Sequence, residues 1–268
     1  MRREDKNLKN LILAILLFFA LFPFFLMFQM SLKPPPIALE PTLIFIPTLD
    51  NYLTVLNKGL MNNLVNSLIV ATFSALITMV CSVPTSYVFS RRKLSKIMFI
   101  YFITLFIPLM PIAITSFFVS QKIGLYDTHL FVILMLCTLR IPFTCLLVKP
   151  FFDAIPIEIE EAASIDGCTK NEVFIKIILP LAIPAIICGF LYAFFLSWND
   201  FSLTFLITGS NTKLATAFLM ELRGYYGRVY WSEIAAGTIL VSIPGIIFAF
   251  LLQKYFIKGF SGVLLGKG

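Results

Sequence analysis

Residues 161–184 read EAASIDGCTKNEVFIKIILPLAIP and place several charges between two strongly apolar runs. Gly167 offers the left-handed backbone conformation that ends a helix without a Cβ clash. Thr169 and Glu172 have the spacing of a capping box, so a second helix can begin directly after this turn. Leu179 and Pro180 interrupt that helix just before the next apolar run. The stretch therefore predicts a short acidic helical hairpin at the edge of an apolar protein.

The composition places the chain among integral membrane proteins. Of its 268 residues, 59% are hydrophobic and only 13% are charged, whereas a soluble domain carries about 25% charged residues. Several apolar runs reach the roughly 20 residues that a helix needs to cross a bilayer, and helices satisfy their own backbone polar groups, as lipid requires. We expect an all-α membrane protein with six transmembrane helices, at about residues 11–30, 64–89, 97–120, 130–148, 181–206 and 234–252.

The first apolar run has a competing interpretation as a cleaved signal peptide, because basic residues precede it. The run is too long for that, and Phe and Met stand where small residues would mark a cleavage site. We expect an uncleaved helix at residues 11–30.

The distribution of Lys and Arg predicts the orientation. The segments on the N-terminal side of the six spans hold 14 of the 21 basic residues, the opposite loops hold 6, and Arg140 lies inside a span. Positive residues favour the cytoplasm, so both termini and the loop around Glu161 are expected there. The net charge of +7 then reflects membrane topology, and no nucleic-acid partner is implied.

No enzyme or metal motif is present. The five Cys residues lack metal-ligand spacing. The run from Gly262 to Lys267 is one residue too short for a phosphate-binding loop and lacks the Ser or Thr that follows its Lys. His129, the only histidine, is expected to have a capping or interfacial role. We expect no catalytic residue, no metal and no bound ATP in this chain.

The joint spacing of Glu161, Ala162, Ala163, Gly167 and the Leu179–Pro180 pair resembles the EAA coupling loop of permease subunits of ABC importers. Each short piece is weak evidence by itself, but the joint spacing over about twenty residues is a specific signal for this family. Further pieces are similar to the carbohydrate branch of these permeases, in the half that resembles the second membrane subunit of maltose importers. They include the runs YVFSR at 87–91, GLYDT at 124–128 and WND at 198–200.

This resemblance implies the type I permease fold of ABC importers, as one six-helix domain over residues 1–268. Its core would lie at about 64–254, the coupling loop at 153–180 and a cytoplasmic tail at 254–268. The first short helix of the loop would lie in a groove of an ATPase subunit. The residues expected to couple to the ATPase are Glu160, Glu161, Ala162, Ala163, Asp166, Gly167, Leu179 and Pro180.

The resemblance also implies partner proteins and a cellular location. The chain would form half of the pathway of an ATP-driven, binding-protein-dependent sugar (oligosaccharide) importer in a prokaryotic cytoplasmic membrane. A second permease subunit, two ATPase subunits holding ATP and Mg, an extracytoplasmic sugar-binding protein and membrane lipid would be its partners. The same family also imports glycerol phosphate and other polyols, which stays an alternative.

Charged groups within the spans are candidates for the pathway, because charges deep in a bilayer usually face a cavity or a partner. We expect Tyr192, Asn199 and Asp200 to line the pathway, with Arg140 as a pore or pairing residue. The alternative is that Arg140 makes a structural contact between helices.

The last outer loop is rich in aromatic residues, namely Tyr225, Tyr226, Tyr230 and Trp231. They could stack on sugar rings, although a membrane-interface belt is the simpler interpretation. In maltose-type relatives this loop reaches the binding protein, so a protein contact is a third possibility.

A secondary transporter is a more remote alternative. Such a protein would more often show paired broken helices in two related halves and ion-coupling charges at mid-membrane. The chain shows no convincing internal repeat. A structural or receptor-like membrane subunit is a further rival, but it would not need the acidic hairpin.

Overall fold

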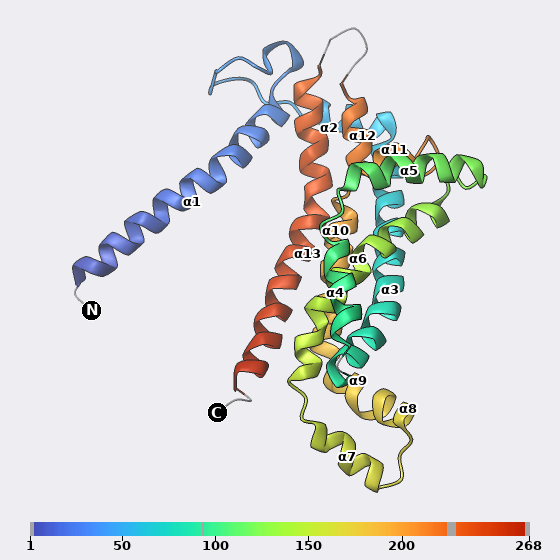
Figure 1. Cartoon of the computed structure of the whole chain (residues 1–268). Coiled ribbons are helices and arrows are strands. Elements are labelled where there is room, and N and C mark those ends of the chain that lie inside the picture. Colours follow the sequence, from blue (N-terminus) through green and yellow to red (C-terminus); the bar gives the residue numbers. More distant parts are fainter. Residues whose placement is uncertain (1–2, 93, 224–228, 266–268) are drawn as a thin grey trace. The chain divides into compact units, whose positions relative to one another are not determined.

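The computed structural model describes residues 3–92, 94–223 and 229–265, and this part of the chain is helical with no β-strand (Figure 1). The elements, in chain order, are α1 (Arg3–Leu32), η1 (Pro35–Ile37), α2 (Asp50–Val55), η2 (Leu56–Leu60), α3 (Met61–Arg91), α4 (Ser95–Thr104), α5 (Leu109–Lys122), α6 (His129–Asp153), α7 (Ile157–Ile165), α8 (Lys170–Glu172), η3 (Val173–Ile178), α9 (Leu179–Leu181), α10 (Ile183–Trp198), α11 (Thr204–Ile207), α12 (Ala215–Glu221) and α13 (Trp231–Leu265).

Four continuous helical stretches are long and apolar enough to cross a membrane, and the described chain has up to six spans if two bent pairs are counted. The continuous stretches are Lys9–Leu32, Asp50–Arg91, His129–Asp153 and Trp231–Leu251. They include the predicted first, second and fourth spans and all but the last residue of the predicted sixth. α13 also continues through residues 254–265, where the sequence predicted a tail.

The predicted third span, residues 97–120, is two helices in the structure. α4 and α5 are bent by 85° relative to each other. Pro108 precedes α5 in an extended conformation, with φ −60° and ψ 136°. Because proline lacks an N–H and keeps the residue before it out of the helical region, the helix stops at this point.

The predicted fifth span, residues 181–206, is also interrupted. The segment Lys170–Leu181 is bent by 74° from α10, and the bend falls at Ala182, with Pro184 in the first turn of α10. At its other end α10 stops at Trp198, and the short helix α11 begins only at Thr204. The apolar run therefore holds one long helix with a break at each end.

The chain divides into two compact units, residues 1–62 with 218–243, and residues 63–217 with 244–268. In the first unit, the end of α1 is joined to α2. Asn51 donates hydrogen bonds to the carbonyls of Ser31 (2.8 Å) and Lys33 (2.9 Å), and the Tyr52 hydroxyl lies 2.7 Å from Ser31 Oγ. Residues 9–26 of α1 are exposed, although nearly all of them are apolar.

The second unit has a core in which α3, α6 and α10 pack together. Small polar side chains of α3 lie within this core, and hydrogen bonds join them to α6. Ser86 Oγ lies 3.1 Å from the carbonyl oxygen of Cys145, and Ser82 Oγ lies 3.4 Å from that of Ile141. Such small hydroxyl side chains let helix backbones approach closely in a membrane. The ring of Phe194 stacks on that of Phe248 at 3.8 Å between centroids.

Candidate functional site

The predicted acidic hairpin is present, and its turn has the expected chemistry. α7 ends at Ile165, and Gly167 follows with φ +90°. The Cys168 N–H donates to the carbonyl of Ala163 (3.0 Å) and the Gly167 N–H to that of Ser164 (3.2 Å), which is the Schellman pattern. Thr169 and Glu172 then form a capping box at the start of α8. α7 begins directly after Pro156, which stands at its N-cap position.

An apolar cluster seats this hairpin against the ends of longer helices. Ala163 of α7 and Val173 of η3 are buried together with Val83, Val148 and Phe152 of α3 and α6. Leu179, a predicted coupling residue, packs partly on the same cluster, whereas Pro180 is exposed. Displacement of the hairpin would therefore disturb the ends of spanning helices.

A polar clasp formed by Glu160 and Arg91 joins α7 to the end of α3. Arg91 Nε donates to Glu160 Oε1 at 2.6 Å, and the Tyr87 hydroxyl donates to Glu160 Oε2 at 2.6 Å. The remaining nitrogens of Arg91 donate to the carbonyls of Phe152 (2.9 Å) and Ile155 (3.1 Å). One guanidinium thus holds the end of α3, the end of α6 and α7 in a fixed arrangement.

The other predicted coupling residues lie on the surface of the hairpin. Glu161, Ala162 and Asp166 are exposed. Among the described residues the Glu161 carboxylate has no hydrogen-bond partner, so Glu160, its neighbour, is the residue that fixes the loop. Ile165 adds an apolar side chain that is 86% exposed. The exposed part of α7 therefore offers both acidic and apolar groups to a partner.

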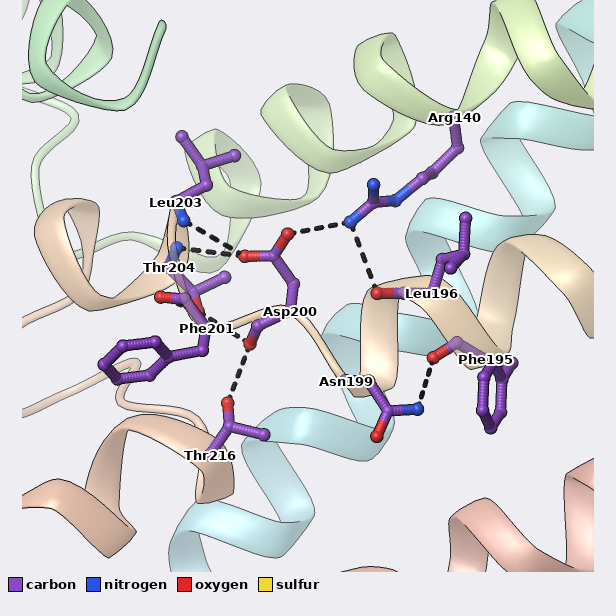
Figure 2. A network of polar contacts seen from close by, with 9 residues as sticks. All are labelled: Arg140, Phe195, Leu196, Asn199, Asp200, Phe201, Leu203, Thr204 and Thr216. Atoms are coloured by element: carbon purple, nitrogen blue, oxygen red, sulfur yellow. Dashed lines mark hydrogen bonds and ion pairs between the residues drawn. The ribbon is translucent and has the colours of Figure 1, made fainter. Parts of the chain in front are cut away.

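Arg140 of α6 and Asp200, which lies just beyond the end of α10, form a buried ion pair, which Figure 2 shows in close view. Arg140 Nη2 donates to Asp200 Oδ2 at 2.7 Å and to the carbonyl of Leu196 at 3.2 Å. The two side chains retain 12% and 5% of their exposure. The pairing that the sequence offered as one alternative for Arg140 is present.

Asp200 also holds the break between α10 and α11 (Figure 2). Its Oδ1 accepts hydrogen bonds from the backbone N–H groups of Leu203 (3.3 Å) and Thr204 (3.2 Å). Its own carbonyl accepts from the Thr216 hydroxyl at 2.7 Å. One carboxylate therefore neutralises Arg140 and satisfies two N–H groups that the broken helix leaves free.

Two other predicted pathway residues lie close by on α10 and just beyond its end. Asn199 is exposed, and among the described residues its amide donates only to the carbonyl of Phe195, at 2.8 Å. The half-buried ring of Tyr192 stacks on Phe143 with 4.8 Å between centroids. The Asn199 oxygen is therefore available to other molecules, whereas the Asp200 carboxylate is occupied.

The aromatic residues of the last outer loop are described only in part, because Tyr225 and Tyr226 lie outside the described residues. Tyr230 and Trp231 are partly exposed. The ammonium of Lys58 lies 4.9 Å from the centre of the Tyr230 ring and forms an ion pair with Glu233. These contacts, all within the first unit, hold Tyr230 at the start of α13.

Sequence reasoning missed a second polar clasp, formed by Asp127. Its Oδ1 accepts from the N–H groups of Gly209 (2.8 Å) and Thr212 (2.9 Å) and from the Thr212 hydroxyl (2.7 Å), while Oδ2 accepts from the Asn211 N–H (3.0 Å). Burial by itself would raise the pKa of Asp127, but these hydrogen bonds outweigh it and hold the pKa below its ordinary value. A Cβ at Gly209 would lie 2.6 Å from this carboxylate, so the clasp requires glycine there.

His129 supports the same loop through Asn66. Its Nε2 lies 3.0 Å from Asn66 Oδ1, and the Asn66 amide donates to the carbonyls of Asn211 (3.0 Å) and Lys213 (3.2 Å). Thr128, rather than His129, caps α6. Among the described residues, no group of three His, Cys, Asp or Glu side chains could hold a metal ion.

Comparison with known proteins identifies relatives along nearly the whole chain. The trehalose transport system permease protein SugB of Mycobacterium tuberculosis is 30% identical, covering 92% of this chain and 93% of SugB. The trehalose/maltose transport system permease protein MalG of Thermococcus litoralis is 28% identical, covering 98% of this chain and all of MalG (100%).

A solved structure shares the fold. One chain of a bacterial ABC transporter involved in the import of the acidic polysaccharide alginate superposes with a TM-score of 0.77 at 21% identity, covering 96% of this chain and 99% of that chain. The fold is therefore that of an ABC importer permease. The family model described as "Binding-protein-dependent transport system inner membrane component" matches residues 74–262. The chain belongs to this family of ABC transporter inner-membrane permeases.

Proposed function

We propose that this chain is a permease subunit of an ATP-driven importer that takes up sugars delivered by an extracytoplasmic binding protein. The hairpin of α7 and α8 is the observation that carries the proposal: it is short, capped on both sides of its turn, seated on the spanning helices and exposed on its acidic face. The names of the relatives, which concern trehalose and maltose, support a sugar as the substrate.

The coupling step follows from the stiffness of this hairpin. α7 would dock on an ATPase subunit through Glu161, Ala162, Ile165 and Asp166, which are exposed. Closure of the ATPase pair on ATP would push α7, and the clasp through Arg91 would pass the movement to α3 and α6. A rigid lever is required for this, and helix caps stabilise a short helix by about 1 kcal/mol each.

The remaining partners follow from the surface of the chain. α1 exposes an apolar surface along residues 9–26, which lipid and a second permease subunit would cover. Two ATPase subunits would supply ATP and Mg, and we propose that this chain does not hydrolyse ATP. The described units together would form one permease domain, with both termini in the cytoplasm as the Lys and Arg distribution favours.

The substrate pathway is proposed to include Asn199, whose amide oxygen is available, and the neighbouring Tyr192. Asp200 and Arg140 are proposed to hold the break at which Asn199 is presented. Tyr225, Tyr226, Tyr230 and Trp231 are proposed to contact the binding protein.

The coupling role is tested with variants of the hairpin in the assembled complex. Nothing lies within 4 Å of a Cβ at Gly167, so a substitution there is limited by its φ of +90° and not by space. Gly167→Val should abolish coupling because a β-branched residue avoids this conformation, whereas Gly167→Asn tolerates it and should retain uptake. Glu161→Lys should leave insertion and assembly intact but lower uptake by about tenfold or more, as loss of a single ionic contact of about 1.4 kcal/mol would.

Two readouts are needed: sugar uptake, and stimulation of ATP hydrolysis by loaded binding protein. Normal uptake and normal stimulation in both Gly167→Val and Glu161→Lys would overturn the coupling role.

A further inference from the structure

A groove of about 830 Å³ lies between the hairpin and the end of α3. This volume is typical of sites that hold a ligand. All of its walls belong to the second unit: the last turns of α3, one face of α7, and α8 with the start of η3. The groove thus separates the proposed lever from the spanning helix to which it is clasped.

The floor of the groove is apolar and continues an exposed apolar row on α3. Pro84 and Val88 of α3 line it, and with Leu76 and Val80 they form one i, i+4 row of a helix. All four side chains are exposed, Val80 by 74%. The row therefore leads from the membrane-spanning part of α3 directly into the groove.

The mouth of the groove carries exposed basic side chains. Arg92 and Lys170 line it and are exposed, and neither forms an ion pair among the described residues. Arg91 also lines the groove but is committed to Glu160. Glu161 contributes one opposing charge, so the charges at the mouth that lack a salt bridge favour an anion.

The groove has an apolar floor, which continues an exposed apolar row of a spanning helix, and a basic mouth. This combination matches the chemistry of a phospholipid. Basic pockets between spanning helices at the cytoplasmic surface bind anionic head groups. We propose that the groove binds one anionic phospholipid of the cytoplasmic leaflet, with its phosphate near Arg92 and Lys170 and an acyl chain along Val88 and Pro84. The bound lipid would brace α7 against α3.

This inference rests on the proposed cytoplasmic position of the hairpin. The occupant that competes with lipid is an apolar side chain of the ATPase subunit, and the test separates the two.

The test is a titration of the purified importer complex in mild detergent with phosphatidylglycerol or phosphatidylcholine, with bound lipids counted by native mass spectrometry. The wild-type complex should retain phosphatidylglycerol in preference to phosphatidylcholine. Replacing both basic residues, as Arg92→Gln with Lys170→Gln, should weaken phosphatidylglycerol binding by about 25-fold, since each basic group near an anionic surface contributes about fivefold.

Two matched variants sharpen the result. Lys96→Gln removes an exposed basic residue of α4 that does not line the groove, and it should leave binding unchanged. Val88→Trp keeps every charge but fills the apolar floor, and it should abolish retention of the lipid.

Equal retention of phosphatidylglycerol by the wild type and the Arg92→Gln, Lys170→Gln variant would overturn the proposal. The proposal would also be overturned if phosphatidylglycerol were retained only by a permease pair from which the ATPase subunits had been removed. The groove would then be a binding site for the ATPase. Lipid counting requires no transport. A failed lipid site would therefore leave ATPase stimulation intact, and failed coupling would leave the lipid count intact.

Discussion

At the scale of single residues, the Asp200 carboxylate makes two kinds of contact, and both stabilise the fold. It neutralises Arg140 at 2.7 Å, and it accepts the N–H groups that begin α11. Removing one partner of a buried ion pair destabilises a protein by about 3–5 kcal/mol, because the other charge is left uncompensated. The structural importance of Asp200 therefore lies mainly in its charge.

We predict that Asp200→Asn destabilises the protein by about 3 kcal/mol, although an Asn oxygen can still accept from Leu203 and Thr204. Adding Arg140→Met should recover most of this loss, because no uncompensated charge then remains. Denaturation of the purified complex in mild detergent measures both variants. A stable Asp200→Asn with weaker substrate affinity would instead show that Asp200 contacts the substrate.

Asn199→Ala is the matched control for the pathway. Within the described part of the chain its amide bonds only to the carbonyl of Phe195 in α10, so stability should stay within about 0.5 kcal/mol of the wild type, as is usual for exposed sites. Uptake should fall if Asn199 lines the pathway.

The sequence could predict that Arg140 and Asp200 need partners, because an unpaired charge in a bilayer is unfavourable. It could not identify each as the partner of the other, since 60 residues separate them. The clasp of Asp127 was missed for the same reason. The groups that donate to it lie 82 to 85 residues away, and only the run at 124–128 marked the place.

At the scale of elements, α7 is held by a clasp that a lysine cannot reproduce. Arg91 uses its nitrogens on Glu160 and on two carbonyls, and the ammonium of lysine lacks this planar fork. We predict that Arg91→Lys and Glu160→Gln each increase hydrogen exchange of the α7 amides by at least about tenfold, since hydrogen bonds to charged groups contribute about 1.5–3 kcal/mol.

Lys149→Gln is the control for this prediction. It removes an i, i+4 pair with Asp153 on the surface of α6, and such pairs contribute only about 0.3–0.5 kcal/mol. Exchange in α7 should not change. Unaltered exchange in Arg91→Lys would show that apolar packing, and not the clasp, holds α7.

The sequence predicted those features of the helices that depend on residues close together in the chain. Gly167, Thr169 and Glu172 gave the turn and the cap of the hairpin, because both depend on residues within one turn. The breaks near Pro108 and Asn199 were not predicted. Proline is tolerated within other helices of this chain, such as Pro84 in α3 and Pro142 in α6, so its presence alone does not distinguish a continuous helix from a broken one.

At the scale of the whole molecule, the apolar surface requires a solvent other than water. Exposed large hydrophobic side chains run along α1, α3, α4 and α5, far beyond the patches of a soluble monomer. Composition predicted this correctly, because burial of so many apolar residues in so small a chain is not possible without lipid or a partner. Which surfaces meet lipid and which meet a second subunit depends on chains that the sequence does not contain.

The orientation of the chain in the membrane can be tested by labelling single cysteines from each side. In a background with its five cysteines replaced by alanine, Ile165→Cys should react with a membrane-impermeant maleimide only in inside-out vesicles, because the Lys and Arg distribution places the hairpin in the cytoplasm. Ser210→Cys, also exposed, should react only in intact spheroplasts. Co-expression of the ATPase should protect Ile165→Cys, whose native side chain is 86% exposed in this chain, and should leave Ser210→Cys unaffected. Labelling of Ile165→Cys in intact spheroplasts would show that the topology is the reverse of the one predicted. The hairpin would then lie outside the cytoplasm, where it could not couple to an ATPase.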